Sequence, residues 1–422
     1  MMNPATQASA VQQGGDTGLV AFVPRINIHC FCDNQQTAET MQSVSADRRM
    51  SRAHVTIQLG GIMAAAQVYQ TQATPNLLMV ESHGSRDVIL SELAQLAGVC
   101  QPDTKVVVIG HLNDVILYRE LMRQGVSEYV VAPLHQMQII ETVSNLYNDP
   151  KASPIGKIIA FVGAKGGVGS STIAHNVAWQ MSKRFATDTV ITDLDLAFGT
   201  AGLNFNQDTA SGMIDALGQP ERVDSTLIDR LLTKLGDKLS LLSGPGGVDR
   251  EINIEAHAIE TILGALRTSV PCVVVDVPNI WTSWVKYTLV SADEVIITAT
   301  PELASLRNTK NLVDMLKTAR PNDKQPRLVI NQVGVPKRPE IPAAEFGKAV
   351  GIDPTCVVPH DPQSFGNAQS NGQMLFEVAP KSKAAEALAA LTQSIAGIEK
   401  PAKAAKSAFP SLFDKLPMLR KK

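Results

Sequence analysis

Short hydrophobic runs alternate with helical stretches along two segments of the chain. In the first segment, residues 25–149, we predict strands at Asn27–Cys32, His54–Leu59, Leu77–Glu81, Lys105–Ile109 and Glu128–Val131. Apolar residues recur at helical spacing between the strands, most clearly in Val115–Gln124 and Met137–Tyr147. A regular alternation of strands and helices is typical of a doubly wound parallel sheet. This segment is therefore predicted to be a small α/β domain.

A second and longer α/β pattern covers residues 157–398. Its predicted strands are Lys157–Val162, Thr189–Asp193, Leu239–Leu242, Cys272–Val277, Glu294–Ala299, Arg327–Asn331 and Cys356–Val358. Most of them are continuous apolar runs, as expected for strands that helices cover on both faces. The sequence thus predicts two doubly wound parallel-sheet domains in one α/β chain.

Three segments lie outside the predicted domains. Residues 1–24 are rich in Gln, Ala, Ser and Gly, and we expect a disordered leader there. Residues 150–156 contain Pro150 and Pro154 and are predicted to be a linker. The tail, residues 399–422, is basic and carries apolar residues at near-helical spacing. Two interpretations of the tail remain open: a segment that lies on a membrane surface, or one that docks on the protein or stays disordered.

Composition narrows the class of protein. The chain has 422 residues, enough for two or three domains, and a net charge of −2, which disfavours a general coat on nucleic acid. No apolar run is long enough to span a bilayer, and the leader lacks the features of a secretory signal. The five scattered cysteines fit a reducing cytoplasm, and we expect Cys30 and Cys32 to face opposite sides of their strand. None of the eight histidines is expected to form a metal site.

The most informative motif lies between the second domain's first strand and first helix. It reads Lys165-Gly166-Gly167-Val168-Gly169-Ser170-Ser171-Thr172. A glycine-rich turn at the start of a helix brings backbone N–H groups together and adds the partial positive charge of the helix terminus. Glycine also lets the backbone approach an anion closely. The motif therefore predicts a phosphate-binding loop.

Polar side chains follow three other predicted strands of this domain. Asp193 and Asp195 end one strand, Asp276 ends a second and Asn331 ends a third. The carboxyl ends of parallel strands line one crevice, so these side chains should lie beside the glycine loop. Each acid alone could be a helix cap or a turn former, but their joint placement favours a nucleotide site.

These motifs resemble those of the MinD/ParA family of P-loop NTPases. The matching segments are Lys165–Gly169, Asp193-x-Asp195, Asp276-Val277-Pro278, Ser291–Ile297 with Thr300-Pro301-Glu302, and Asn331. The resemblance implies a MinD/ParA-like domain that binds ATP and Mg²⁺ and dimerises with the nucleotide between the subunits.

The same resemblance implies roles for individual residues. Lys165 would reach the phosphates held by the partner subunit, and Asp195 would position the attacking water. Mg²⁺ would be held by Ser171, Asp193 and Asp276. The nucleotide would contact the loop from Lys165 to Thr172, Asn331, and the segment of Pro359, His360 and Asp361.

Two positions depart from the family pattern. Ala164 replaces the first glycine, and Ser170 replaces the lysine that normally contacts the β- and γ-phosphates. A neutral hydroxyl donates a weaker hydrogen bond than a charged amine does. We therefore expect nucleotide binding to persist and hydrolysis to be slow or to depend on dimerisation.

The first domain has the size and element order of a receiver, a flavodoxin-like fold, but lacks receiver chemistry. Glu81 stands at the phosphoacceptor position, Gly110-His111 at the switch position and Ala132-Pro133 at the conserved lysine. Phosphotransfer is not expected. A pseudo-receiver ahead of a MinD/ParA-like ATPase resembles the CpaE/TadZ proteins of Flp (Tad) pilus assembly, as does Ser170. That resemblance implies a cytoplasmic protein, polar or peripheral at the inner membrane, whose partners are pilus assembly and secretion proteins.

Two other functions remain open. A DNA-segregation or division-site ATPase of the same fold would need a basic surface on its dimer, which the net charge disfavours. A scaffold with a vestigial P-loop would explain Ser170. Trp281 and Trp284 follow the strand that ends at Asp276, and we interpret them as core residues unless they prove exposed, when they would suit a partner contact.

Overall fold

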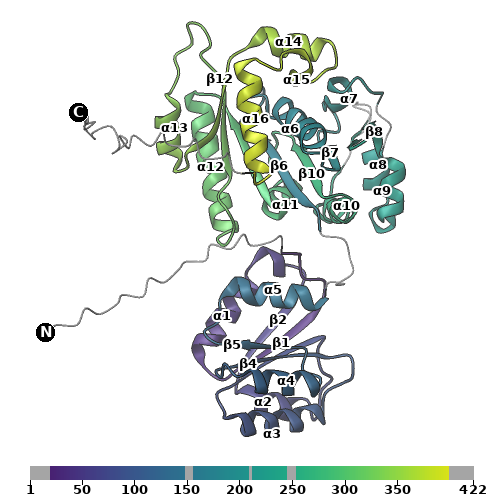
Figure 1. Cartoon of the computed structure of the whole chain (residues 1–422), viewed down its shortest axis with the longest axis vertical. Helices are drawn as coiled ribbons and strands as arrows, with labels where there is room; N and C mark the ends of the chain where they lie inside the picture. The colour runs from purple at the N-terminus through teal and green to yellow at the C-terminus, as the bar shows by residue number, and fades with distance from the viewer. Residues whose placement is uncertain (1–19, 148–154, 209–211, 245–252, 399–422) are drawn as a thin grey trace, which may run out of the picture.

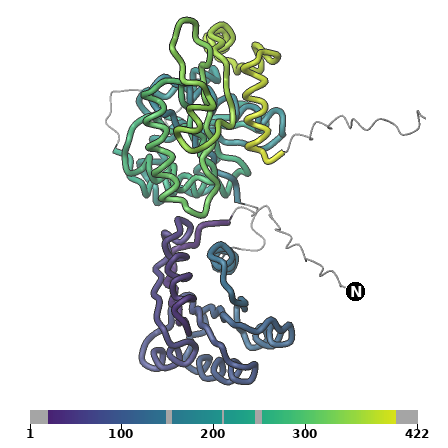
Figure 2. The backbone as a smooth tube through the Cα atoms, turned by 90° about the vertical axis from the view of Figure 1, so that its left-hand side faces the viewer, coloured from purple at the N-terminus to yellow at the C-terminus, as the bar shows by residue number. Residues whose placement is uncertain are grey.

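Two parallel sheets, each at the centre of its own domain, organise the chain. The structure, a computed structural model, describes residues 20–147, 155–208, 212–244 and 253–398. The N-terminal domain and the C-terminal domain lie end to end along the longest axis (Figures 1 and 2). The predicted α/β class with two doubly wound domains is confirmed.

The N-terminal sheet has five parallel strands in the order β2-β1-β3-β4-β5. This order is the flavodoxin-like one, with a topological switch point between β1 and β3. The predicted strands are confirmed with bounds β1 (Asn27–Cys32), β2 (His54–Leu59), β3 (Leu77–Ser82), β4 (Lys105–Gly110) and β5 (Glu128–Val131).

Helices cover both faces of the N-terminal sheet (Figure 1). One face packs against α1 (Gln35–Ser45) and α5 (Gln136–Tyr147), and the short helix η1 (Arg48–Met50) follows α1. The other face packs against α2 (Gly61–Val68), α3 (Arg86–Ala97) and α4 (Val115–Arg123). Burying both faces explains why all six residues of β3 are buried.

The C-terminal sheet has eight strands in the order β13-β12-β11-β6-β10-β7-β9-β8. Its strands are β6 (Lys157–Gly163), β7 (Thr189–Asp193), β8 (Thr233–Gly236), β9 (Leu239–Leu242), β10 (Cys272–Val277), β11 (Glu294–Ala299), β12 (Arg327–Val333) and β13 (Pro354–Pro359). All seven predicted strands are present. The short edge strand β8 was not predicted and is antiparallel to β9.

Helices form two layers around this sheet. One face packs against α6 (Ser170–Arg184), α15 (Leu375–Val378) and α16 (Lys383–Ile395). The other packs against α8 (Gly212–Gly218), α9 (Ser225–Leu231), α10 (Ala256–Ser269), α11 (Ser283–Ser291), α12 (Leu303–Ala319) and α13 (Ala343–Val350). The remaining short elements are α7 (Ala201–Asn204), η2 (Pro220–Arg222) and α14 (Pro362–Ser370). Among the described residues, no helix is both long and apolar enough to cross a membrane.

Three expectations need correction. Ala21 and Val23 are buried, and the Val23 N–H donates to the Arg49 carbonyl oxygen at 2.9 Å, so the end of the expected leader belongs to the fold. Gly156, expected in the linker, is buried and donates to the Arg267 carbonyl oxygen. Cys30 and Cys32 lie on the same face of β1, because residues two apart in a strand share a face. The rest of the leader, residues 148–154 of the linker region and the tail lie outside the described residues.

A buried charge network joins the two domains. The Arg48 guanidinium donates to the Asp323 carboxylate at 2.8 Å and to the Ser291 carbonyl oxygen at 2.7 Å. Arg49 pairs with the same carboxylate, and the Asn322 side chain donates to Asp47 at 2.9 Å. The Arg48 and Asp323 side chains are less than a tenth exposed, so their ion pair excludes water. The hydrogen bond from Arg48 to the Ser291 carbonyl oxygen fixes η1 against the end of α11.

Candidate nucleotide site

The glycine loop follows β6 and ends where α6 begins. Gly167 and Gly169 have φ values of 78° and 86°, which favour glycine. A Cβ atom at Gly169 would lie 2.6 Å from the Asn331 Nδ2 atom, so no larger residue fits there unchanged. Ala164 is not among the residues with positive φ, and its N–H donates to the Thr298 carbonyl oxygen at 2.8 Å. Alanine therefore fits where the family pattern has glycine.

Side-chain amides bind the carbonyl oxygens of this loop. Asn331 donates to the Val168 oxygen at 2.8 Å and Gln332 to the Gly167 oxygen at 3.2 Å. Asn308 donates to the Ala164 oxygen at 2.9 Å, and Asn279 to the Gly163 oxygen at 2.7 Å. These bonds fix the backbone from its carbonyl side and leave its N–H groups available to another ligand.

The N–H groups of the loop are free of acceptors. Across the described part of the chain, no hydrogen bond from a backbone N–H of residues 165–172 to a protein acceptor is found. The first N–H groups of α6 have no intrahelical acceptor by geometry, and the helix terminus carries partial positive charge. The Ser170 hydroxyl is buried and also lacks a hydrogen-bond partner in this described part of the chain. Such a set of unpaired donors is suited to an anion with several oxygens.

Lys165, at the start of the loop, points to a carboxylate of its own chain. Its Nζ atom lies 2.6 Å from the Glu302 Oε1 atom, and both side chains are about a third or more exposed. The hydrogen bond from Lys165 lowers the pKa of Glu302. Glu302 precedes α12 and was noted in the sequence only as part of a motif, so this pairing was not predicted.

Two carboxylates lie side by side beneath the loop. Asp193 on β7 and Asp276 on β10 are partners in the register of neighbouring strands, and both are buried. Burial, together with the charge of Asp276, raises the pKa of Asp193 to about 6. The nearby charge of Asp276 disfavours the ionised form of Asp193, and a cation between the two carboxyl groups would relieve the repulsion.

His175 on α6 completes this buried group. Its Nε2 atom lies 3.6 Å from the Asp276 Oδ2 atom, and its Nδ1 atom is 2.9 Å from the Asn204 side-chain nitrogen. With Asp193 and Asp276 it forms a cluster whose ligand atoms lie within 4.8 Å of one another. The expectation that no histidine joins a metal-binding group was therefore wrong in geometry. The contact joins α6 to β10, which sequence spacing does not reveal.

Asp195 and Ser171 lie near this pair. Asp195 is partly exposed, its N–H donates to Asp193 at 3.0 Å, and its carboxylate accepts from the Phe198 N–H at 3.0 Å. Ser171 is in the first turn of α6, partly exposed. The structure therefore brings the predicted acids to the same sheet edge as the loop.

A pocket of about 260 Å³ opens next to the loop and holds the remaining predicted residues. Its lining includes Gly169, Thr172, Asn331, Pro359, His360 and Asp361. Asp361 caps α14, since its carboxylate accepts from the Ser364 N–H at 3.0 Å. The pocket also includes Phe365 and Met374, apolar side chains that could contact the flat face of a base. Sequence reasoning missed these two residues because neither α14 nor the turn before α15, where Met374 lies, carries a motif.

The residues present fit magnesium with a nucleotide. Carboxylate and hydroxyl oxygens are the ligands that Mg²⁺ prefers, and it is usually bound through one or two carboxylates plus phosphate oxygens. Asp193 and Asp276 supply the carboxylates, and Ser171 supplies a hydroxyl one residue beyond the buried, unpaired hydroxyl of Ser170.

The corresponding edge of the N-terminal sheet is filled rather than open. Glu81 is fully buried and accepts hydrogen bonds from the N–H of Asp33 at 2.7 Å and the hydroxyl of Thr37 at 2.8 Å. His111 lies 3.0 Å from the same carboxylate. The receiver positions thus carry a hydrogen-bonded network in which Glu81 is buried and His111 is partly exposed.

The two tryptophans after β10 differ in exposure. Trp284 is buried, as expected for a core residue, but Trp281 is 59% exposed. Ile280 beside it is 51% exposed. These side chains form an apolar surface beside the loop, where a partner contact is the open alternative.

Comparison with known proteins shows what the chain is similar to. A family model described as an AAA domain matches residues 156–330. The crystal structure of the pilus assembly protein CpaE from Caulobacter crescentus is 50% identical over 31% of this chain and 98% of that chain, with a TM-score of 0.30. The chain belongs to the CpaE family of pilus assembly proteins. The assignment rests on sequence identity, because the match spans only the length of one domain.

Other relatives match the larger domain. The structure of a ParA family ATPase from Chlorobium tepidum covers 57% of this CpaE-family chain and 98% of its own length, with 24% identity and a TM-score of 0.51. The septum site-determining protein MinD of Helicobacter pylori is 24% identical over 38% of this chain and 58% of its own length. The first of these likenesses shows the ParA fold.

Proposed function

We propose that this chain is a MinD/ParA-like ATPase of pilus assembly that binds ATP with Mg²⁺ and organises the pilus secretion machinery through nucleotide-dependent dimerisation. The observation that carries the proposal is the row of unpaired N–H groups at residues 165–172, at the start of α6 and above Asp193 and Asp276. Membership of the CpaE family supports the place of this chemistry in pilus assembly.

Each part of the site has a defined task in this proposal. The loop N–H groups hold the phosphate oxygens, and Asn331, Pro359, His360 and Asp361 surround the base. Asp193, Asp276 and Ser171 hold Mg²⁺, whose charge offsets that of the phosphates when it is bound. Asp195, partly exposed at the end of β7, orients a water toward the terminal phosphate.

Lys165 connects nucleotide binding to dimerisation. In the single chain it pairs with Glu302, on the exposed side of the site. An exposed ion pair contributes only about 0–1 kcal/mol, so the lysine can exchange this partner for the phosphates of a second subunit. Dimerisation would then bring the charged Lys165 side chain of each subunit to the phosphates bound by the other subunit.

Hydrolysis is expected to be slow because Ser170 offers no charge. A lysine at this position would stabilise the charge that develops on the transferred phosphoryl group. The Ser170 hydroxyl is buried and lacks a partner among the described residues, so it can donate one neutral hydrogen bond.

Calorimetric titration with Mg·ATP and Mg·ADP tests the proposal directly. We expect both nucleotides to bind. We also expect the rate of ATP hydrolysis to be low in the wild type and higher in Ser170→Lys. Asp188→Asn, at an exposed residue just before β7, serves as a control that should change neither nucleotide affinity nor turnover. If neither nucleotide binds to the full chain, the proposal is wrong.

A nucleotide-independent scaffold is the second candidate, and Ser170 favours it. Sedimentation of the full chain with ATP, with ADP and without nucleotide separates the two, because a scaffold would keep one oligomeric state.

A DNA-segregation role predicts a gel shift that weakens steeply with salt. Flotation with liposomes of the full chain and of a chain ending before Pro401 tests whether the tail binds a membrane.

A further inference from the structure

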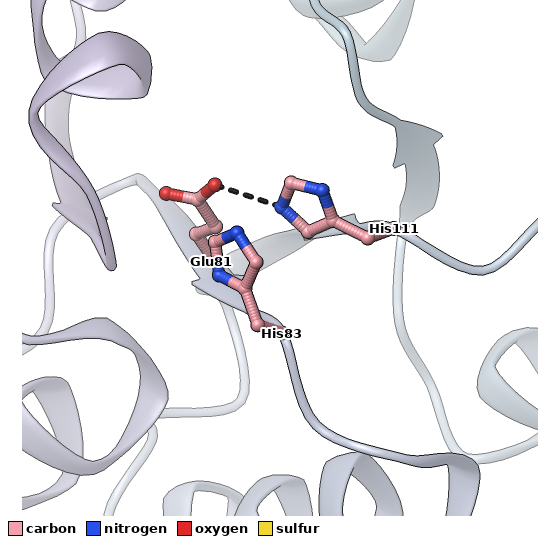
Figure 3. A group of neighbouring side chains, drawn as sticks. All are labelled: Glu81, His83 and His111. Carbon is pink, nitrogen blue, oxygen red and sulfur yellow. Dashed lines mark hydrogen bonds and ion pairs between the residues drawn. The ribbon is translucent and has the colours of Figure 1, made fainter.

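A second group of metal-ligating side chains lies in the N-terminal domain, far from the glycine loop in sequence. Glu81 ends β3, His83 follows it, and His111 follows β4 (Figure 3). We call these three residues the histidine cluster. Their ligand atoms lie within 4.8 Å of one another. The Glu81 Oε1 atom and the His111 Nε2 atom are 3.0 Å apart, and the two imidazole rings stack with centroids 3.7 Å apart.

The cluster has the supporting contacts that metal ligands require. Backbone and side-chain donors orient the buried Glu81 carboxylate, among them the Asp33 N–H, the Asn34 side chain at 2.8 Å and the Thr37 hydroxyl. The His83 Nδ1 atom lies 2.9 Å from the Asp33 Oδ2 atom. If Nδ1 donates to this carboxylate, Nε2 carries the free lone pair, as in the carboxylate–histidine–metal arrangements of many sites.

The distances fit a shared ion. Two ligands that each lie about 2.1 Å from a metal are roughly 2.9 to 3.4 Å apart at octahedral or tetrahedral angles. The 3.0 Å between Glu81 and His111 is already in this range. His83 must turn its ring out of the stack to aim Nε2 at the same point, and the Asp33 side chain, 41% exposed, must turn with it to keep their hydrogen bond. The His83 side chain is 46% exposed, and that of His111 is 32% exposed, so both can adjust.

We propose that the histidine cluster binds one divalent transition-metal ion of the Zn²⁺ class, with Asp33 supporting His83 from behind. Imidazole nitrogens together with a carboxylate suit Zn²⁺, Co²⁺, Ni²⁺ or Cu²⁺, whereas Mg²⁺ prefers oxygen ligands alone. The carboxylates of Glu81 and Asp33 are negatively charged and would repel a phosphate or another anion, so the ligand is a cation. The ion would connect the carboxyl ends of β3 and β4, where a receiver carries its phosphorylation chemistry.

Titration of the full chain with Zn²⁺ tests this site. Mg²⁺ is kept in excess so that it competes for the carboxylates of the C-terminal site. We expect one Zn²⁺ per chain, and at least about tenfold weaker binding in His83→Gln and in His111→Gln. Glutamine at position 83 can keep a hydrogen bond to Asp33 while it removes the ligand nitrogen. His54→Ala is the matched control, because His54 is exposed at the opposite end of the same sheet and should leave the affinity unchanged.

A Co²⁺ titration gives an independent readout, since the visible absorption of bound Co²⁺ changes with its ligands and their geometry. The spectrum should be lost in both cluster variants and kept in Asp276→Asn. Three results would overturn the proposal: no Zn²⁺ bound by the wild type, equal affinity in His83→Gln and wild type, or a signal that disappears in Asp276→Asn instead. Circular dichroism of each variant distinguishes loss of the ligand from loss of the fold.

Discussion

The two domains share one architecture but differ at the edge of the sheet where such folds bind ligands. In each, parallel strands carry their loops to one edge of the sheet, the place where α/β folds bind ligands. In the C-terminal domain that edge exposes unpaired N–H groups and a pocket beside them. In the N-terminal domain the buried Glu81 takes up the donors of the edge and contacts His111. The fold supplies the location, and the side chains at the edge decide whether a phosphate can enter.

A receiver-like domain without a phosphate site can still act through its surfaces. Here its contact with the C-terminal domain is built from η1, whose arginines face α11 and the loop that contains Asp323. The N-terminal domain is thus attached at the end of the second sheet away from the glycine loop (Figure 1).

The largest effect is expected at the junction. Arg48→Ala leaves Asp323 and the Ser291 carbonyl oxygen short of a donor in a buried network. Breaking a buried ion pair costs about 3–5 kcal/mol, and the lower end applies because Arg49 and Arg320 still face Asp323. Small-angle scattering should show the domains separating. Arg52→Ala, which removes an exposed pair with Glu260, should cost less than about 1 kcal/mol. Equal effects of the two variants would contradict the network described above.

The next effect concerns pH and the acids of the C-terminal edge. Because the folded pKa of Asp193 is raised to about 6, the folded state binds its proton more tightly than the unfolded chain does. Without nucleotide, the free energy of unfolding should therefore decrease as the pH rises from about 4 to about 6, by no more than about 3 kcal/mol. Bound Mg²⁺ should remove this slope.

Urea titrations across this pH range provide the measurement. Asp193→Asn should flatten the slope, and Asp188→Asn should keep it, because Asp188 is 54% exposed at the start of the same strand. If the pH dependence of the free energy of unfolding persists in Asp193→Asn, it comes from another titratable group.

A smaller effect is expected within the glycine loop. Gly169→Ala places a side chain at a φ of 86° and 2.6 Å from the Asn331 amide nitrogen. The left-handed conformation alone costs about 1–2 kcal/mol, so nucleotide affinity should fall roughly tenfold or more. Gly166→Ala is the control, since a Cβ there meets no atom within 4 Å and the φ is not positive. Calorimetry should find near-normal binding for Gly166→Ala, and a similar loss in both variants would argue against the loop geometry.

The smallest effect is expected at the exposed pair. Glu302→Gln removes the partner of Lys165, which should change the free energy of unfolding by less than about 1 kcal/mol. The same change frees Lys165, so ATP-dependent dimerisation measured by sedimentation should become slightly more favourable. Asp314→Asn, which breaks the similarly exposed pair with Lys310, should leave dimerisation unchanged. A loss of several kcal/mol in the free energy of unfolding of Glu302→Gln would contradict the weak pairing.

Periodicity and motif spacing predicted most of the architecture, since local patterns decide these features. Buried strands in parallel sheets are continuous apolar runs, so twelve of the thirteen strands within the described residues were recognised. The exception, β8, carries Thr, Lys and Gly at an edge of the sheet and has no such run. The glycine loop and the acids at strand ends were also predicted, because the carboxyl edge of a parallel sheet collects them.

The remaining features depend on contacts between distant segments. The sequence Asp47-Arg48-Arg49 looks like a solvated turn, and only docking against Asp323 turns it into a buried network. Glu81 and His111 were noted for what they replaced, but their contact with each other follows from the register of β3 and β4. The pairing of Lys165 with Glu302 likewise requires the loop and α12 to be placed in space.

The helix α11 is held at one end and free of that restraint at the other. Arg48 from the N-terminal domain and Arg320 bind carbonyl oxygens of its last turn, while the exposed Trp281 precedes its first. Any rearrangement that starts at Asp276 must then pivot about the anchored end. The N-terminal domain thus sets the point about which α11 would rotate. In a chain without this domain, Trp281 would move along a different path.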